Sequence, residues 1–387
     1  MDHKFLIIGA GFSGSVLAQQ LAENLDCTIE IWDERSHVGG NCHTEKDKET
    51  GIMVHQYGPH IFNTDKKDIW DYVNSFGHFH PYVHRVKANS NGSIYSLPVN
   101  LGTINQFFNK SFSPQEAKEF LKSLTDKSIN DPKNFEEQAL QFIGPELYKA
   151  FFYGYTKKQW GCEPSLLPAS ILKRIPVRFN YDDNYHAHAY TGIPEKGYTA
   201  VMQAMVASPR IQVFLNRIFK PGKENLETFT HVFYTGPLDA YFHHRYGRLG
   251  YRTVTFEKFQ EEGDYQGTAQ MNYCDEDIPY TRITEHKHFS PWQQFDKTIY
   301  FKEYSKETGT SDIPYYPKCL EDDKILLKKY REDAVAEKGV SFLGRLATYR
   351  YMDMHHVIGE ALSMAGDFTA AIRSKTALPI FPSNLFL

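Results

Sequence analysis

Six residues near the start of the chain have the types and spacing of a phosphate-binding turn. Gly9-Ala10-Gly11-Phe12-Ser13-Gly14 follows the apolar run 5–8 and precedes a segment with helical periodicity. In such a turn Gly9 permits the tight bend, Gly11 lets the backbone approach a pyrophosphate, and Gly14 allows close helix–strand packing. The free N–H groups and partial positive charge of the helix N-terminus favour an anion.

The residues after the next apolar run, 28–32, indicate which ligand the turn holds. Asp33 ends this run at the position from which an acidic residue accepts hydrogen bonds from ribose hydroxyls. Glu34, Arg35 and Gly39-Gly40-Asn41 continue it in the pattern that flavoproteins place against the FAD pyrophosphate. Near the C-terminus, a late strand followed by Gly344-Arg345 and a new helix can bring the chain back to the flavin side of a long cofactor. These two features favour FAD over NAD. A second Gly-x-Gly-x-x-Gly is absent from the sequence, so no dedicated NAD(P)H domain is evident.

An aromatic stripe crosses the expected helix 146–159. Tyr148, Phe151, Phe152 and Tyr155 recur at helical spacing, and Trp160 follows at the helix end. Periodicity alone favours a core stripe. The alternative is a stacking platform for a nucleobase, because aromatic faces stack on flat bases.

Arginines far from the glycine turn could bind phosphate oxygens. Lys173, Arg174 and Arg178 lie in a Pro-containing segment, where the alternative is a solvated charged loop. Arg282 lies in a strand-like segment, where a salt bridge is the ordinary role. His60 stands beside Gly58-Pro59, and a lone histidine is more often structural than catalytic. The sequence contains no evident Ser–His–Asp arrangement, metal-ligand set or acidic dyad, and we predict no metal.

The elements that must position these residues form an interrupted α/β pattern. Residues 1–80, 195–240 and 335–370 are expected to build a discontinuous FAD-binding domain. Residues 100–165 are expected to form a helical domain, with a mobile loop near 165–180. Short strands predict an antiparallel sheet domain from 81–99, 181–194 and 241–334, and 371–387 is expected to be a loose C-terminal tail. The fold class is therefore α/β: a Rossmann-like FAD-binding domain with an inserted helical domain and an antiparallel β-sheet substrate domain.

Composition excludes several other classes. The 387 residues carry a net charge of −4, which gives no reason to expect nucleic acid or an anionic membrane as partner. Five scattered cysteines favour neither a disulfide scaffold nor a zinc site. Lys4 and the apolar run after it superficially resemble a signal peptide, but a strand–turn–helix explains the glycines better. We expect a cytoplasmic protein without membrane insertion.

Eight segments together resemble the bacterial UDP-galactopyranose mutases. They are GAGFSG, DERSHVGGNCHT, YGPHIFNTD, FIGPELYKAFFYGYTKKQWG, LPASILKRIPVRFNYDDNY, PYTRITEHKHFSPW, IPYYP and GRLATYRYMDMH, and they run from residue 5 to about 360. The resemblance implies interconversion of UDP-galactopyranose and UDP-galactofuranose, without net redox change. It also implies that FAD must be reduced and that its N5 attacks the anomeric carbon of the sugar.

The resemblance further implies a role for each matching residue. Arg174, on a mobile loop, and Arg282 would clamp the diphosphate, and His60 would lie beside the flavin and be linked to its redox state. The phosphates would also be bound by Tyr185, Tyr316 and Tyr351, and the uridine and sugar by Phe151, Phe152, Tyr155, Thr156, Trp160 and Asn272. The implied FAD contacts, including the turn residues, are Gly9, Gly11, Phe12, Ser13, Gly14, Asp33, Glu34, Arg35, Gly40, Asn41, His60, Ile61, Arg345, Asp353, Met354 and His355. An external reductant such as NAD(P)H and a homodimer are implied as well.

Two positions depart from the family pattern, and two other functions compete with it. His84 stands where related sequences carry an asparagine that contacts the sugar, and Asn63 replaces a second histidine. A flavin oxidase or dehydrogenase would explain the glycine turn, although its substrate would not require two arginines. A catalytically silent nucleotide-binding scaffold is the other alternative.

Overall fold

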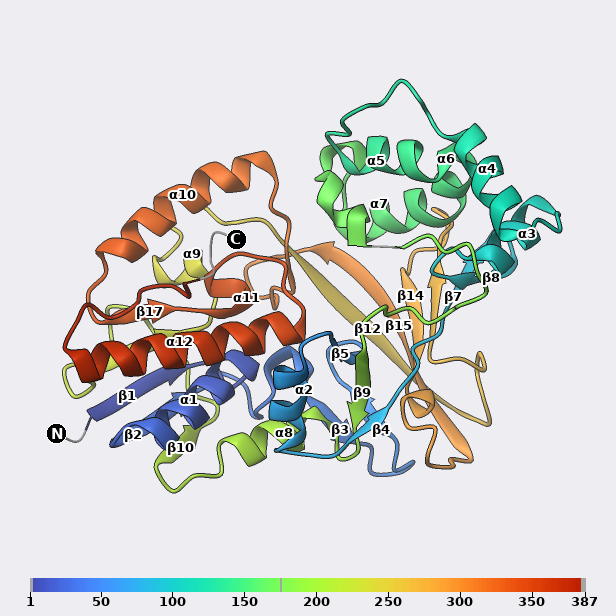
Figure 1. Cartoon of the computed structure of the whole chain (residues 1–387). Coiled ribbons are helices and arrows are strands. Elements are labelled where there is room, and N and C mark those ends of the chain that lie inside the picture. The colour runs from blue at the N-terminus through green and yellow to red at the C-terminus, as the bar shows by residue number, and fades with distance from the viewer. Residues whose placement is uncertain (1–2, 175, 384–387) are drawn as a thin grey trace.

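The computed structural model describes residues 3–174 and 176–383, with Ser170, Lys173 and Arg174 described by their backbone only. Its first domain is built on a parallel sheet in the order β10-β2-β1-β11-β17 (Figure 1). The strands are β1 (His3–Ile8), β2 (Cys27–Trp32), β10 (Ile211–Phe214), β11 (His231–Tyr234) and β17 (Val340–Phe342). The apolar runs form buried strands here because helices cover both faces of the sheet.

The two faces of this sheet carry separate cores. Against one face lie α1 (Phe12–Asn24), α8 (Gly197–Met205) and α12 (Met354–Ser374), with buried side chains such as Leu17, Met202 and Phe368. The other face packs against α9 (Leu238–Tyr241) and α10 (Glu321–Ala336) through residues that include Tyr241, Tyr330 and Phe342. The short helix α11 (Gly344–Ala347) follows β17, and α2 (Lys67–Asn74) borders α12.

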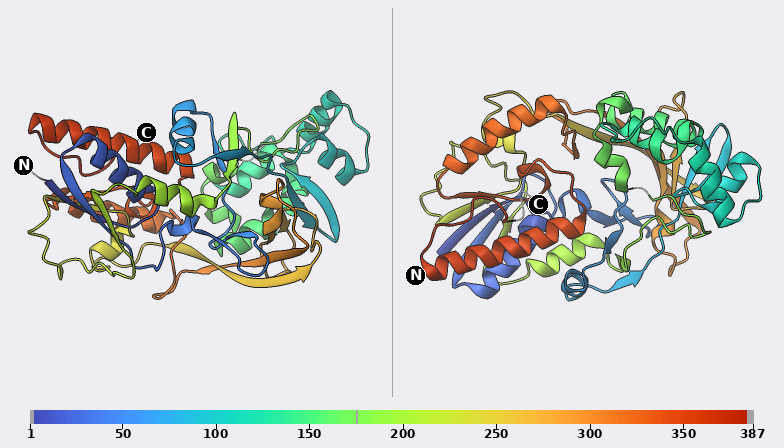
Figure 2. Two further views of the ribbon diagram at one scale, coloured as in Figure 1. Left: turned by 90° about the horizontal axis from the view of Figure 1, so that it is seen from below. Right: turned by 45° about the horizontal axis from the view of Figure 1, so that its top comes forward.

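A seven-stranded sheet extends from this domain, with its long strands β12 and β15 reaching away from it (Figures 1 and 2). Its order is β16-β12-β15-β14-β13-β7-β8. Every neighbouring pair is antiparallel except β7–β13, which is parallel. The strands are β7 (Val86–Ser90), β8 (Ser93–Leu97), β12 (Tyr251–Glu262), β13 (Gln270–Tyr273), β14 (Arg282–Glu285), β15 (Lys297–Glu307) and β16 (Tyr316–Pro317).

The helical domain lies over the far end of this sheet (Figures 1 and 2). It contains α3 (Leu101–Phe108), α4 (Pro114–Leu124), α5 (Phe135–Phe142), α6 (Gly144–Leu147), a π-helical stretch at Tyr148–Tyr153 and α7 (Gly154–Trp160). Ser113 and Glu116 form a capping box at the start of α4, with Pro114 at its first position. The helix expected over 146–159 therefore exists, but a π-helical stretch interrupts it.

Smaller elements connect these parts. Two short sheets hold β3 (Thr44–Lys46) with β4 (Met53–His55), and β5 (Phe62–Thr64) with β9 (Tyr190–Pro194) and β6 (Phe79–Pro81). Turns of 3₁₀ helix occur at Gly40–Cys42, Pro164–Leu166, Ala169–Arg174 and His286–Phe289. Within the described ranges, every helix is too short or too polar to cross a membrane.

The structure differs from the expected division of the chain in two places. Residues 321–334 were expected in the sheet domain, but α10 packs Tyr330 and Ala334 onto the parallel sheet. The tail from 371 was expected to be loose. Instead α12 continues to Ser374, Ile380 and Phe381 pack against the parallel-sheet core, and the carbonyl of Ile380 accepts a hydrogen bond from Phe342 N (2.8 Å). A short apolar segment near a chain end can thus cover the edge of a core.

Candidate active site

A long cavity of about 620 Å³ opens at the carboxyl ends of the parallel strands. This is where open α/β sheets bind ligands. The expected cofactor residues that line it are Gly9, Gly11, Phe12, Ser13, Asp33, Glu34, Arg35, Gly40, Asn41, His60, Arg345 and Met354. The glycine turn is tight: a side-chain carbon added to Gly9, whose φ is +108°, would lie 2.1 Å from Thr235 Oγ1.

The carboxylate of Asp33 accepts hydrogen bonds from the backbone. Its Oδ2 accepts a hydrogen bond from Ala10 N (2.7 Å), and its Oδ1 accepts one from Arg35 N (2.9 Å). These bonds fasten the end of β2 to the glycine turn. Glu34, whose side chain is exposed beside the cavity, is the carboxylate left open to a ribose hydroxyl.

Arg35 and Asn41 form the rim of the same cavity. Arg35 Nη2 donates to Asn41 Oδ1 (2.8 Å), and the guanidinium lies 4.6 Å from the centre of the Tyr57 ring. Its Nη1 is buried and has no hydrogen-bond partner among the described residues. A buried donor without a partner is costly, so this atom suits an anionic ligand.

The sheet register builds the second part of the site. Asn272 on β13 pairs with Arg282 on β14, and Arg282 pairs with Glu303 on β15. Directly paired residues point to the same face of a sheet, so these three polar side chains stand in one row. Arg282 Nε donates to Glu303 Oε2 at 2.8 Å, and Glu303 is 1% exposed. A buried row of this kind holds a fixed positive charge beside the cavity.

The protonation states of Arg282 and of nearby His60 are defined at neutral pH. Burial, the largest single influence, would lower the pKa of Arg282, but the Glu303 carboxylate together with Tyr155 and Tyr316 more than offsets it and raises that pKa well above its usual range. Burial lowers the pKa of His60 to about 4, helped by the positive charges of Arg345 and Arg282. Arg282 is therefore a cation and His60 a neutral imidazole.

His60 has a defined tautomer. Its Nδ1 lies 2.8 Å from the carbonyl oxygen of Gly58, and a carbonyl can only accept, so Nδ1 carries the proton. Nε2 of the neutral ring is then a hydrogen-bond acceptor. Behind it, His55 Nδ1 accepts from His60 N (3.2 Å), and His286 Nδ1 accepts from His55 N (3.3 Å).

Tyrosines surround the Arg282 guanidinium. The electrostatic neighbours of Tyr155 are Arg282, Glu303, Tyr185 and Tyr316. Tyr316 stacks on Tyr351 with ring centres 5.6 Å apart, and the Arg345 guanidinium lies 5.6 and 5.4 Å from these two rings. Burial raises the pKa of Tyr316 to about 12. Its hydroxyl therefore keeps its proton and can donate to an anion.

The aromatic stripe divides between core and site. Phe151 is 2% exposed and packs against Tyr95 and Phe107 at 5.1 and 5.5 Å between ring centres. Its ring thus belongs to the core of the helical domain, as the helical periodicity alone predicts. One turn later Tyr155 is partly exposed and faces Arg282. Phe152 in the π-helical stretch and Thr156 and Trp160 in α7 are buried. Trp160 lies 6.4 Å from the Tyr351 ring.

Several expected site residues lie elsewhere or outside the description. Arg174 ends the 3₁₀ turn Ala169–Arg174, and its side chain is outside the described residues. Gly14, Ile61, Asp353 and His355 do not line the cavity: Gly14 packs α1 on β1, Ile61 is buried in a small cluster with Phe289, Asp353 precedes α12, and His355 is buried beside His188.

The two departures from the family pattern are a buried histidine and a partly exposed asparagine. His84 is 3% exposed, and its Nδ1 has no hydrogen-bond partner among the described residues. Its ring lies 5.8 Å from that of Tyr185. Asn63 donates to the Ile61 carbonyl (3.0 Å) and contacts His188 Nδ1 through its Oδ1.

Sequence reasoning missed one end of the cavity. Residues after β10 and β11 line it, and Arg217 lies 3.4 Å over the Trp32 ring centre. A usable signal existed, because ligand-binding loops follow the carboxyl ends of parallel strands and both strands were expected. The missed lining residues at this end are Trp32, Arg217, Phe219, Pro221, Tyr234, Thr235, Gly236, Asp239, His244 and Arg248.

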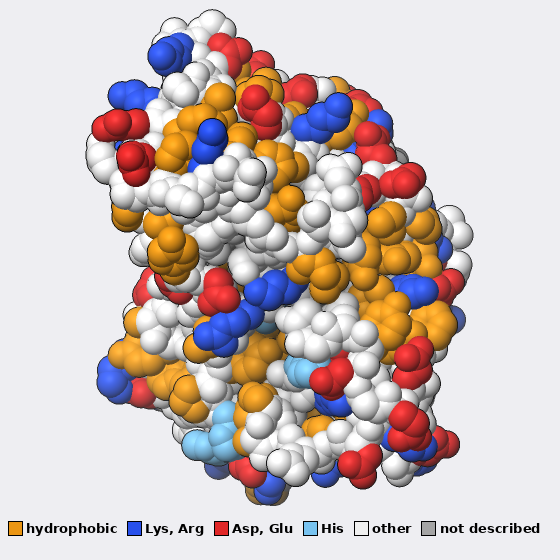
Figure 3. Space-filling model, turned by 90° about the vertical axis from the view of Figure 1, so that its right-hand side faces the viewer, with side chains coloured by type: hydrophobic (Ala, Val, Ile, Leu, Met, Phe, Trp, Pro, Cys, Tyr) orange, Lys and Arg blue, Asp and Glu red, His pale blue; other side chains and the backbone are white. Residues whose placement is uncertain are grey.

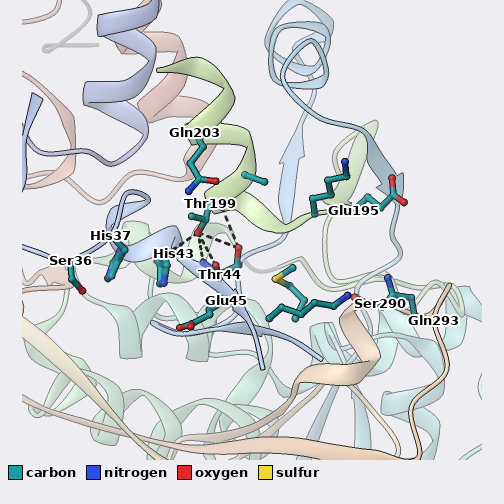
Figure 4. Close-up of a pocket in the computed structure, with 14 residues that line it drawn as sticks. Ser36, His37, His43, Thr44, Glu45, Glu195, Thr199, Gln203, Ser290 and Gln293 are labelled. Atoms are coloured by element: carbon teal, nitrogen blue, oxygen red, sulfur yellow. Dashed lines mark hydrogen bonds between the residues drawn. The ribbon is translucent and has the colours of Figure 1, made fainter. Parts of the chain in front are cut away.

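A separate cavity of about 700 Å³ contains none of the expected site residues. Figure 4 shows Thr199 of α8 bonded to Thr44 and His43 at its wall. Glu45 and Glu195 offset Lys46 and Lys196 there, so its charge favours no ligand. On the surface in Figure 3, basic and acidic side chains are interspersed among apolar ones, without a broad area of one sign.

Buried neutral histidines should make folding sensitive to acid. Burial lowers the pKa of His84 and His286 to about 3 and that of His231 to about 4, against 6.5 when unfolded. The unfolded chain thus binds more protons, so stability is full above pH 6.5 and falls below it. Each histidine contributes up to about 1.4 kcal/mol per pH unit.

The measurement is the free energy of unfolding in urea at pH 7, 6 and 5. We expect a loss of at least about 2 kcal/mol between pH 6.5 and 5, where most carboxylates are still ionised. His231→Gln should show a shallower slope, because glutamine does not titrate. A free energy that stays constant over this range would contradict the prediction.

The cavity on a parallel sheet, joined to a row of arginine and tyrosine side chains, defines a nucleotide-dependent enzyme of the Rossmann class. A model of NAD(P)-binding Rossmann-like domains matches residues 7–76, and the model of the UDP-galactopyranose mutase family matches residues 150–351. The chain belongs to the UDP-galactopyranose mutase family, and it is an isomerase that acts on a nucleotide sugar.

Individual relatives are similar over nearly their whole length. A probable UDP-galactopyranose mutase of Klebsiella pneumoniae is 54% identical over 98% of this chain and 99% of its own. A dTDP-fucopyranose mutase of Escherichia coli is 51% identical over 94% of this chain and 97% of its own. A solved structure of reduced UDP-galactopyranose mutase aligns with a TM-score of 0.74 over 99% of this chain and 100% of that one; at 16% identity it supports the fold alone.

Proposed function

We propose that this chain interconverts UDP-galactopyranose and UDP-galactofuranose with bound, reduced FAD. The observation that carries the proposal is the Arg282–Glu303 pair at 2.8 Å, which keeps a partly exposed cation beside neutral His60 and among protonated tyrosines. A diphosphate needs fixed positive charge and hydrogen-bond donors, whereas an amine or other uncharged substrate of an oxidase does not.

FAD fits the long cavity better than a shorter ligand. The glycine turn would cradle the pyrophosphate, Arg35 Nη1 would satisfy it, and Glu34 would hold a ribose. His60, Arg345 and Met354 would border the flavin at the other end. When bound and reduced, the cofactor supplies N5 as a nucleophile toward the anomeric carbon, with no net redox change over a turnover.

The residues of the chain would bind and orient the sugar nucleotide and stabilise the charge of its diphosphate. Arg282, with Arg174 from the opposite side, would neutralise the diphosphate as the bond to the sugar breaks. Tyr185, Tyr316 and Tyr351 would donate to its oxygens. The uridine and sugar would lie against Phe152, Tyr155, Thr156, Trp160 and Asn272, with Phe151 supporting this wall from the core. His60 Nε2 would accept a hydrogen bond at the flavin edge.

A second substrate competes with the first because of one relative. The dTDP-fucopyranose mutase of Escherichia coli is 51% identical to this chain, close to the 54% of the Klebsiella protein. The two sugar nucleotides share the diphosphate and the ring rearrangement, so Arg282 and the tyrosines would serve both. They differ at the base, the ribose and the sixth carbon of the sugar.

One assay tests both substrates. The purified protein is incubated with UDP-galactofuranose or dTDP-fucofuranose, with and without dithionite, and the sugar nucleotides are separated chromatographically. We expect conversion only with reduced FAD and a higher kcat/KM for the UDP sugar. A higher kcat/KM for the dTDP sugar would assign the second function, and no conversion of either sugar by the fully reduced protein would refute both. Replacing dithionite with NAD(P)H tests the expected external reductant.

A further inference from the structure

The ammonium group of Lys158, on α7, is held by backbone carbonyls alone. Its Nζ lies 2.9 Å from Tyr273 O, 2.7 Å from Asp275 O, 2.9 Å from Ile278 O and 3.1 Å from Tyr280 O. Among the described residues, none of the ion pairs within 4.0 Å includes Lys158. Carbonyl oxygens arranged in this way replace the hydration shell of a monovalent cation.

The segment that binds Lys158 connects two residues of the sugar-nucleotide site. Asn272 precedes it on β13, and Arg282 follows it on β14. The helix of Lys158 carries Tyr155, Thr156 and Trp160 on the facing wall. The two walls touch directly, because a side-chain carbon added to Gly154 would lie 2.3 Å from the Cys274 carbonyl oxygen.

The C-terminal end of α7, where Lys158 lies, is also fastened to the sheet. Arg252 on β12 donates from Nε to Gln159 O (2.9 Å) and from Nη2 to Lys158 O (3.2 Å), and Ser305 Oγ donates to Gln159 O (2.6 Å). These bonds satisfy the last carbonyls of the helix. The position of α7 is thus set from the sheet. Segment 274–281 is bonded to neighbouring strands at its two ends, where Cys274 N donates to Asn89 O (2.9 Å) and Thr281 N donates to Glu303 O (2.8 Å), while Lys158 joins the carbonyls of the turn between these ends.

We propose that Lys158 is a positioning residue for nucleotide-sugar binding: its ammonium group fills a cage of four carbonyls and so holds segment 274–281, and with it Asn272 and Arg282, against α7. Burial lowers the pKa of Lys158 to about 8, partly offset by neighbouring acidic groups including Asp275, so the cation persists at neutral pH. The inference rests on the proposed function, because it concerns the binding of the same substrate.

The test removes the ammonium group and then returns it from solution. In the FAD-loaded Lys158→Ala protein, KM for the sugar nucleotide and Kd for UDP should rise roughly tenfold or more, with kcat much less affected, because substrate binding is what the misplaced row loses. Ammonium or methylammonium chloride should lower KM at least roughly threefold relative to choline chloride of equal ionic strength, because the small cation can enter the emptied cage.

Matched variants separate the cage from general effects. Lys158→Met should lose binding like Lys158→Ala but gain nothing from ammonium, because its side chain still occupies the path to the cage. Lys67→Ala should keep a normal KM, since Lys67 lies on α2, away from this segment, and pairs with the exposed carboxylate of Asp71.

Each outcome decides the proposal. An unchanged KM in Lys158→Ala, a raised KM that ammonium does not lower, or an equal ammonium effect in Lys158→Met would overturn it. If the wild-type protein itself neither converts the sugars nor binds UDP, the proposed function fails instead. Retained visible flavin absorbance in each variant confirms that the protein is folded before KM is compared.

Discussion

Arg282→Met should lower kcat/KM by roughly 10²- to 10³-fold while FAD remains bound. Arg282 is the cation of the polar row and is partly exposed, and an electrostatic donor aimed at developing charge is worth this factor in other enzymes. Methionine keeps much of the side-chain volume but removes the charge and all the hydrogen-bond donors. Steady-state kinetics with the reduced protein, together with the visible flavin absorbance, give both quantities.

The same substitution should also destabilise the protein, which requires a matched variant. Without Arg282, the carboxylate of Glu303 is buried at 1% exposure with its cation gone, a change that costs about 3 kcal/mol or more. Arg282→Lys keeps a positive charge for Glu303 and should retain most of the stability, yet still lose most of the turnover because the planar fork is gone. Arg85→Ala breaks an exposed pair with Asp183 and should change kcat/KM less than about twofold. Near-normal turnover in Arg282→Lys would remove Arg282 from the proposed clamp.

Gly14→Ala should yield a protein that does not retain FAD. A Cβ at this position would lie 2.0 Å from the carbonyl oxygen of Gly9 and 3.1 Å from Ile7 Cγ2. Helix α1 would have to move away from β1, which shifts the helix N-terminus that faces the pyrophosphate. The purified protein should be nearly colourless, and added FAD should restore little visible absorbance.

Gly366→Ala is the matched control for this substitution. Gly366 lies within α12, is exposed, and has no heavy atom within 4 Å of an added Cβ. Alanine should stabilise that helix by about 0.5–1 kcal/mol and leave FAD content unchanged. Wild-type FAD content in Gly14→Ala would show that the close approach of α1 and β1 is not needed for the cofactor.

Local sequence patterns predicted those parts of the fold that depend on residues adjacent in the sequence. The glycine turn, with the apolar runs 5–8 and 28–32 that flank its helix, follows from residue type and spacing, and the structure confirms these strands as β1 and β2. The backbone hydrogen bonds of Asp33 could not be predicted from the sequence. Its carboxylate binds Ala10 N and Arg35 N, a contact that depends on how β2 ends beside the turn.

The substrate side could not be derived from local pattern. Asn272, Arg282 and Glu303 form one row only because of the register of three strands, and that register is a property of the assembled sheet. Periodicity treated Phe151 and Tyr155 alike, although one belongs to the core and the other faces Arg282. The packing of Ile380 and Phe381 was missed because a short apolar segment near a chain end has no periodicity to detect.

The order of strands in the parallel sheet has a consequence for synthesis on the ribosome. β1 lies between β2 and β11, and β11 is completed by β17, more than 300 residues after the glycine turn. Gly344 approaches Ser13 so closely that an added Cβ would lie 2.4 Å from its Oγ. The glycine turn therefore forms early, but its cavity closes only after β17 and Gly344 have been synthesised. A ligand that needs the closed cavity can bind only from that point, and a chain that stops before β17 exposes the apolar edge of β11.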